Sequence, residues 1–242
     1  MSEEIQAVFG ATRGTGLEII RCLAAKGVPA VALARDPHRA QEIIGDSARI
    51  VQGDVTQPAT LEKAIQPEWR AIHFTVDITG GIGGRGMFGK REEIYGTVCG
   101  GLINTVEAAK QAGFTGQIVL LSTVGLKIGS FSAWMLDTIK RGLLQASIDK
   151  GAHLRNSGLD YSIVYAGILN NKPGGSTRLL LEQKEMPMKP SLKIARRDLA
   201  RVMVAAVGNA KNKEFNAYEG SGPPQNDSEI AAELAALSPF RQ

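Results

Sequence analysis

The chain has 242 residues, of which 43% are hydrophobic and 21% are charged, as in an ordinary globular protein. Two cysteines cannot build a disulfide framework, no stretch approaches the ~18 apolar residues of a membrane span, and the acidic N-terminus lacks an apolar signal core. We therefore exclude disulfide-rich secreted proteins and membrane proteins, and we expect a cytoplasmic protein without membrane contact. The formal net charge of +4 is too small to indicate nucleic-acid binding.

Short apolar runs alternate with helical patterns along the chain. The predicted strands cover residues 6–9, 29–34, 48–52, 71–76, 117–122, 161–165 and 214–219. The predicted helices cover residues 16–26, 37–44, 60–65, 92–112, 131–156 (broken near Gly142 or Gly151), 197–207 and 228–237, and the predicted loops cover 79–90 and 171–191. This alternation predicts an α/β fold, a doubly wound parallel sheet with helices on both faces. We expect a single domain over residues 1–242, with a small substrate-side segment at about 168–242.

A glycine-rich turn follows the first predicted strand and opens a helix. It reads Gly-Ala-Thr-Arg-Gly-Thr-Gly over residues 10–16. Glycines there permit a tight turn and a close approach of a diphosphate to the backbone, and the helix N-terminus supplies free N–H donors. The strand–turn–helix context is the one that this motif requires. We therefore expect a dinucleotide to contact Gly10, Thr12, Arg13, Gly14, Thr15 and Gly16.

The end of the second strand distinguishes between the two nicotinamide dinucleotides. An acidic residue there binds a ribose 2′-hydroxyl, whereas an arginine accommodates a 2′-phosphate. Arg35 stands at this position and Arg13 could reach the same phosphate, so the sequence favours NADP (NADPH). Asp36 keeps NAD as the alternative, and both arginines could instead be solvated surface charges.

The third predicted strand is followed by Gly-Asp-Val at residues 53–55. We expect Asp54 to accept a hydrogen bond from the adenine amine, with Val55 beside it. The alternative is that Asp54 caps a helix or closes a turn. The three histidines and two cysteines lack metal-ligand spacing, so no metal site is predicted.

Taken together, these motifs resemble those of short-chain dehydrogenases/reductases, and more narrowly those of the atypical, NmrA-like NAD(P)-binding branch. The resemblance covers about residues 5–237. It rests on segments 10–16, 34–37, 53–55, 101–113, 121–123, 154–164 and 194–200. It implies a Rossmann fold, a bound NAD(P), contacts of Gly167 and Ile168 with the nicotinamide, and pairing of two copies through long helices.

One departure from the resemblance concerns catalysis. The commoner branch transfers protons with a Tyr-x-x-x-Lys pair on the helix after the fifth strand. None of the four tyrosines here has a lysine four residues later, and Trp134 falls near the place of that tyrosine. The proton source therefore has to be a different group.

Candidate catalytic residues lie where strands five and six end. Ser122 and Thr123 could hydrogen-bond a substrate carbonyl, or they could simply cap the strand. Tyr165 could donate a proton or serve as an aromatic wall. Lys150 is the weakly preferred partner for the nicotinamide ribose, with Lys140 as the other candidate, and either lysine could instead be a solvated surface charge.

These residues predict an NADPH-dependent reductase of a small apolar or aromatic carbonyl or enone. The predicted loops 79–90 and 171–191 should close over the substrate, and Leu179–Leu181, Met186 and Met188 make the second loop apolar. One alternative is a non-catalytic NADP(H)-sensing regulator or assembly factor, which the missing tyrosine–lysine pair would fit. Another is an isomerase or cyclase that retains the cofactor without net redox change.

Overall fold

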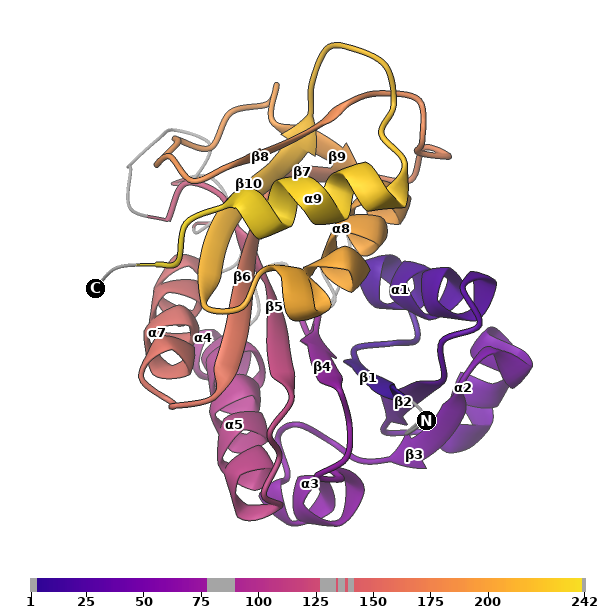
Figure 1. The fold of residues 1–242 in the computed structure, drawn as a ribbon. Coiled ribbons are helices and arrows are strands. Elements are labelled where there is room, and N and C mark those ends of the chain that lie inside the picture. The colour runs from indigo at the N-terminus through magenta and orange to yellow at the C-terminus, as the bar shows by residue number, and fades with distance from the viewer. Residues whose placement is uncertain (1–3, 78–89, 127–133, 135–137, 139–141, 241–242) are drawn as a thin grey trace.

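The computed structural model describes residues 4–77, 90–126, 134, 138 and 142–240, and an eight-stranded sheet runs through their centre (Figure 1). Its strands are β1 (Gln6–Phe9), β2 (Ala30–Ala34), β3 (Arg49–Gln52), β4 (Ala71–Phe74), β5 (Gln117–Thr123), β6 (Asp160–Ala166), β8 (Leu179–Glu182) and β10 (Lys213–Glu219). Their order is β3-β2-β1-β4-β5-β6-β10-β8. All neighbours are parallel except β8, which runs antiparallel to β10 at one edge.

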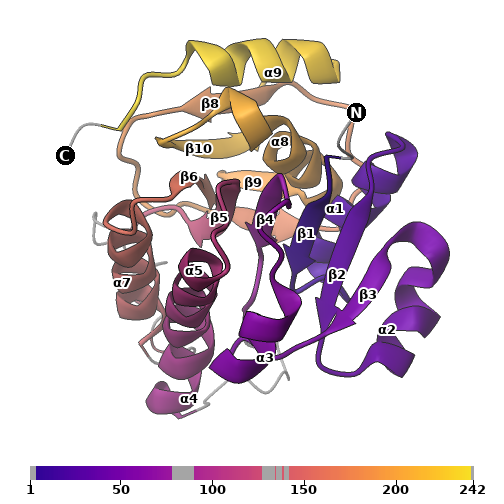
Figure 2. The ribbon, with the colours of Figure 1, turned by 60° about the horizontal axis from the view of Figure 1, so that its bottom comes forward.

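Helices cover both faces of the sheet, as the alternating pattern predicted (Figure 2). One face carries α1 (Gly14–Ala25), α2 (Pro37–Ile44), α8 (Arg196–Asn209) and α9 (Asp227–Ala236), and the other carries α3 (Pro58–Ala64), α5 (Gly101–Gln111) and α7 (Leu143–Arg155). Successive strand residues point to opposite faces. Val8 therefore packs under α1 and α8, whereas Ala7 and Phe9 pack under α3 and α5. Double burial explains why these strands are apolar throughout.

The structure corrects two predicted elements. The predicted loop 171–191 contains β8, and Leu179–Leu181 pair with β10 instead of covering a substrate. The predicted helix 92–112 is divided into α4 (Arg91–Tyr95), a π-helical stretch η2 (Gly96–Gly100) and α5. The predicted loop 79–90 lies outside the described residues, apart from Lys90.

The last third of the chain contributes strands to the main sheet and also forms a small second sheet. Strands β7 (Ile168–Asn170) and β9 (Lys193–Ala195) form a separate two-stranded sheet, which the sequence did not reveal. In contrast, β10 continues the main sheet and α8 packs against α1. The segment 168–242 is thus part of the same fold. A short 3-10 turn, η1 (Gly45–Ser47), joins α2 to β3.

The strand order reverses between β1 and β4, because β2 and β3 lie on one side of β1 and the later strands on the other. Ligands of doubly wound sheets bind in the crevice at such a reversal, beyond the carboxyl ends of the strands. Described residues at or directly after the ends of β4, β5 and β6 line one cavity there. None of the helices in the described part of the chain is long and apolar enough to cross a bilayer.

Candidate functional site

The turn between β1 and α1 has a geometry that only glycine fits at two positions. Gly10 has a φ of +90°, and a Cβ built on it would lie 2.9 Å from Thr75 Oγ1. A Cβ on Gly16 would lie 2.2 Å from the carbonyl oxygen of Gly10. The two glycines therefore allow the start of α1 to fold back against β1 and β4.

The start of α1 fits a diphosphate. No side chain caps the helix at its N-cap residue, Arg13, so its first N–H groups stay available. The hydroxyl of Thr15 is buried and has no hydrogen-bond partner among the described residues. A buried polar atom without a partner is costly, and an acceptor oxygen at this point would satisfy it. The residues of the turn thus match the dinucleotide that the sequence predicts.

The two arginines of the predicted 2′-phosphate clamp have different surroundings. Arg35 is exposed directly after β2. Arg13 is also exposed, but its Nη2 donates to the carbonyl oxygen of Asp77 after β4, at 3.0 Å. Asp36 caps α2, because its carboxylate accepts from the N–H of Arg39 at 3.1 Å. The carboxylate that would favour NAD thus accepts a hydrogen bond from a backbone N–H, and Arg35 is the cation at the end of β2.

Asp54 closes a turn after β3. Its Oδ1 accepts hydrogen bonds from the backbone N–H and the hydroxyl of Thr56, at 2.9 and 2.8 Å. The turn alternative is therefore realised, while Oδ2 makes none of the hydrogen bonds found among the described residues. The carbonyl of Val55 accepts from Asn104 Nδ2 at 2.8 Å, so α5 holds this loop at the carboxyl edge of the sheet.

A cavity of about 100 Å³ opens beyond β4, β5 and β6. Three of the predicted catalytic residues line it, namely Ser122, Thr123 and Lys150, together with Gly167. The other lining residues are Thr75, Val76, Asp77, Val98, Leu121, Leu143, Ser147, Ala166 and Leu169. The hydroxyl of Ser122 is buried and has no hydrogen-bond partner among the described residues. The side chain of Lys150 is buried, and its Nζ donates to the carbonyl of Leu121 at 3.1 Å.

Tyr165 does not line this cavity, although it is the register partner of Ser122. Its hydroxyl donates to Oε2 of Glu214 on β10 at 2.7 Å, on the side of β6 away from β5. Arg155 Nη2 donates to the same hydroxyl at 3.2 Å. Burial, with the charge of Glu214, raises the pKa of Tyr165. With its hydroxyl held by Glu214 and Arg155 and its ring outside the cavity, Tyr165 is not placed to donate a proton there, nor does it form an aromatic wall of that cavity.

The structure allows Trp134 to be compared with the place where the tyrosine of the commoner branch would lie. Trp134 is 63% exposed and does not line the cavity. If Lys150 is the lysine of the pair that the resemblance implies, the tyrosine would stand four residues earlier, where the chain has the buried Ala146. Lys140, the other candidate lysine, lies outside the described residues.

The chain leaves β6 through a constricted backbone position. A Cβ on Gly167 would lie 2.0 Å from the carbonyl oxygen of Leu192, to which the N–H of Ile168 donates at 2.8 Å. Ile168 itself is 49% exposed. Both residues lie at the carboxyl edge, where the resemblance places the nicotinamide. Among the described residues no group of His, Cys, Asp and Glu could hold a metal.

Sequence reasoning missed one cation near the glycine turn. The Nε of Arg196, the first residue of α8, lies 3.6 Å from the place of a Cβ on Gly14. No local sequence pattern indicates this proximity, because Gly14 and Arg196 lie far apart in the chain and α1 and α8 meet only through tertiary packing.

Comparisons with known proteins identify the family and the fold. A family model described as NAD(P)H-binding matches residues 10–210. An uncharacterized chloroplastic protein of Arabidopsis thaliana is 30% identical over 175 residues, which cover 69% of this chain and 59% of that protein. The chain thus spans less than two thirds of the length of this relative.

Solved structures share the fold at low sequence identity. The oxidoreductase ylbE of Lactococcus lactis has a TM-score of 0.75 at 18% identity and covers 98% of this chain and 100% of its own. The anaerobillin reductase ChuY of Escherichia coli O157:H7 has a TM-score of 0.69 at 18% identity, and the match covers 91% of this chain and 100% of ChuY. A short-chain dehydrogenase/reductase of Veillonella parvula in complex with NADP has a TM-score of 0.69 at 16% identity, and the match covers 93% of this chain and 97% of that one. With its glycine turn, its doubly wound sheet and a family model that matches most of its length, the chain is a Rossmann-fold member of the NAD(P)H-binding family.

Proposed function

We propose that the protein is an NADPH-dependent reductase of the NmrA-like branch, acting on a small apolar carbonyl or enone. The observation that carries this proposal is the buried, unpartnered hydroxyl of Ser122 in a cavity at the carboxyl ends of β4, β5 and β6. The reductase and the NADP complex among the structures of the same fold are consistent with it. Val76, Val98, Leu143 and Leu169 line the same cavity and favour an apolar substrate.

Each residue of the site has a role that its position suggests. Reduced nicotinamide, when bound, supplies a hydride. Gly10, Thr12, Gly14, Thr15 and Gly16 hold the diphosphate through backbone N–H groups and the Thr15 hydroxyl. Ser122, assisted by Thr123, donates a hydrogen bond to the acceptor oxygen as negative charge develops there.

The other site residues bind and orient the dinucleotide. Lys150 is held over the end of β5 and is placed to bind the ribose of the nicotinamide. Gly167 and Ile168 form the backbone beside the nicotinamide, and Asp54 and Val55 flank the adenine. Arg13 lies across the crevice, where its guanidinium reaches the loop after β4. The proton comes from water or from the substrate itself.

Replacing Arg35 with Ala should raise the Kd for NADPH by about 10- to 100-fold, because hydrogen bonds to a charged group are worth about 1.5–3 kcal/mol. The Kd for NADH, which lacks the 2′-phosphate, should change less than about twofold. Isothermal titration with each nucleotide measures both values. Arg49→Ala, at the exposed start of β3, removes the same charge away from the site and should change neither. Equal losses for NADPH and NADH would contradict the assignment.

The reductase is tested by following NADPH absorbance with a panel of quinones, flavins, enones and ketones. Ser122→Ala should lower kcat by about 10- to 100-fold without changing the Kd for NADPH, because it removes a donor to the developing oxyanion. Tyr165→Phe is the matched hydroxyl deletion on the neighbouring strand, and its kcat should stay within about twofold. A large loss in Tyr165→Phe with little loss in Ser122→Ala would overturn the assignment.

A non-catalytic NADP(H)-sensing regulator is the second candidate, and two observations favour it. Ala146 stands one helical turn before Lys150 in place of a proton-transferring side chain. The cavity of about 100 Å³ is also smaller than the 300–1,000 Å³ of typical ligand pockets. Tight NADPH binding without turnover of any acceptor would establish this function. Substrate conversion without NADPH consumption would instead indicate an isomerase or cyclase.

A further inference from the structure

A larger cavity, of about 880 Å³, lies on the outer side of α1, apart from the cavity that contains Ser122. We call it the α1–α8 groove, and its lining residues come from one stripe of α1, the start of α8, the loop after β7 and the start of α9 (Figure 1). The α1 stripe begins at Gly14 and continues at helical spacing to Lys26. A helix of this length spans about 18 Å, so the groove is long enough for an extended small molecule.

The groove has more positive than negative side chains. Its lining includes six cationic side chains and only two carboxylates, those of Glu18 and Asp227. Glu18 pairs with Arg21 at 2.6 Å, and Asp227 pairs with both Lys26 and Arg201. Arg201 also pairs with Asp198, at 3.2 Å, so three carboxylates neutralise three of the cations within the protein.

The remaining cations are Lys172, Arg196 and Arg197, and no carboxylate of the described residues pairs with them. Lys172 and Arg197 are exposed, whereas Arg196 is half-buried and donates from Nη1 to Asn171 Oδ1 at 2.6 Å. Unpaired like charges that line one groove repel one another, so binding of an anion among them lowers the free energy of the protein.

The N-terminus of α8 adds to this positive potential. Its first residues, Arg196 and Arg197, line the groove, and no side-chain hydrogen bond is made at its N-cap residue, Ala195. A helix N-terminus has free N–H groups and the equivalent of about half a positive charge. The N–H groups of α1 are not counted, because they are assigned to the dinucleotide. The groove thus combines a concave shape, three unpaired cations and the N-terminus of α8.

We propose that the α1–α8 groove binds a small molecule with two or more linked phosphate groups, held by Lys172, Arg196 and Arg197. Guanidinium groups bind phosphate oxygens through paired hydrogen bonds, which favours phosphate over a single carboxylate. The volume suits a small molecule. The groove adjoins the proposed dinucleotide site at Gly14 and runs from there down α1, away from the strand ends. The second ligand is therefore tested with NADPH already bound, and loss of NADPH during the titration would overturn the proposal of a separate site.

Titration of the NADPH-loaded protein with inorganic tripolyphosphate tests this site. With one equivalent of NADPH present, calorimetry should show one saturable site for tripolyphosphate. Nicotinamide fluorescence reports whether NADPH stays bound during the titration. The double variant Lys172→Ala/Arg197→Ala should weaken tripolyphosphate binding at least tenfold and leave NADPH binding within about twofold.

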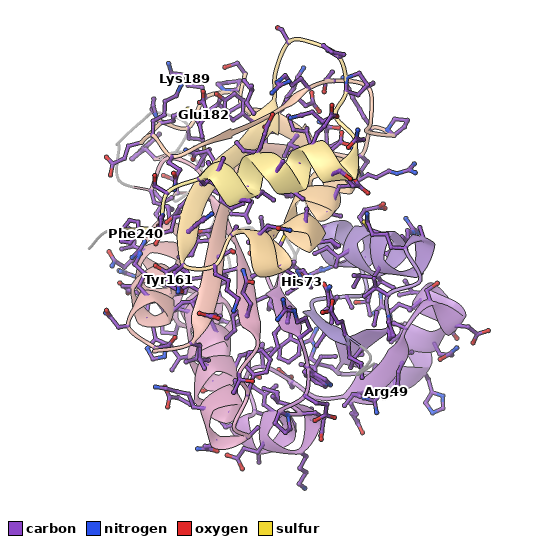
Figure 3. All side chains as sticks on the ribbon, viewed as in Figure 1. Arg49, His73, Tyr161, Glu182, Lys189 and Phe240 are labelled. Atoms are coloured by element: carbon purple, nitrogen blue, oxygen red, sulfur yellow. The ribbon has the colours of Figure 1, made fainter. Side chains whose placement is uncertain are left out.

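The matched control is Arg49→Ala/Lys189→Ala, which removes the same two charges from exposed positions that lie far apart on the surface (Figure 3). Its tripolyphosphate affinity should stay within about twofold. Absence of a saturable heat, equal losses in both double variants, or tighter binding of a single-stranded oligonucleotide than of tripolyphosphate would overturn the proposal. Failure of NADPH itself to bind would instead refute the proposed function, since the groove can be titrated without it.

Discussion

Replacing Gly14 with Asp should weaken NADPH binding by at least about 100-fold, which corresponds to about 2.7 kcal/mol. Gly14 is exposed at the first position of α1, where the diphosphate is proposed to approach. A carboxylate at this point would stand within a few ångströms of the diphosphate. At an effective dielectric constant of about 20, two like charges 4 Å apart repel by about 4 kcal/mol.

The substitution has room for a side chain but strains the backbone. The φ of Gly14 is +55°, in the left-handed region that Asp and Asn adopt more readily than other side chains. The nearest atoms to a Cβ would be Nε and Cδ of Arg196, at 3.6 and 3.9 Å, so no atom blocks it. A carboxylate in the first turn also interacts favourably with the helix dipole. We therefore expect a folded protein whose melting temperature is somewhat below that of the wild type.

Gly14→Asn is the matched control, because it has nearly the same shape and backbone preference without the charge. Its Kd for NADPH should rise less than about tenfold. Calorimetry gives the two dissociation constants, and circular dichroism confirms the fold. If Asn weakens binding as much as Asp does, the effect is steric and the proposed proximity of a diphosphate charge is wrong.

The local parts of this site could be predicted from the sequence. The glycine turn, the strand before it and the helix after it lie within about 20 residues, and the conformations they need are encoded by the residue types themselves. The same holds for Ser122 and Thr123, because the end of an apolar strand can be located to within a residue or two. The structure places these two residues and Lys150 around one cavity.

The parts that could not be predicted depend on contacts between distant segments. Tyr165 ends the strand beside Ser122, as expected, but its hydroxyl turns toward Glu214, which follows 49 residues later. The loop 171–191 is rich in proline and glycine, yet Leu179–Leu181 pair with a strand more than 30 residues further along. Arg196 meets Gly14 only because α1 and α8 pack side by side. In each case the structural role depends on a distant segment that the residue contacts, and the local sequence does not identify that segment.

The buried ion pair that binds Tyr165 leads to the second large effect, on stability. Arg155 Nε donates to Glu214 Oε1 at 2.5 Å and Nη2 donates to Oε2 at 3.2 Å. The side chains are only 18% and 7% exposed. The Arg155 guanidinium also lies over the ring of Phe240, with 5.1 Å to its centroid. This network joins α7, β6, β10 and the chain after α9.

Glu214→Gln should lower the free energy of unfolding by about 3 kcal/mol, because it leaves the largely buried Arg155 without its counter-charge. Asp160→Asn is the control, since Asp160 pairs with Lys211 at 2.6 Å but both side chains are about a third to a half exposed. Such a pair contributes less than about 1 kcal/mol. Urea denaturation measures both losses.

A second variant tests whether the loss comes from the uncompensated charge. Adding Arg155→Met to Glu214→Gln should regain part of the stability, because the buried cation is removed along with its need for a partner. The Kd for NADPH should stay within about twofold in all three variants, since the network lies across β6 from the cavity of Ser122. Equal costs for Glu214→Gln and Asp160→Asn would show that the network is no more than a surface ion pair. In that case Tyr165 would be free to turn, and its exclusion from proton transfer would no longer hold.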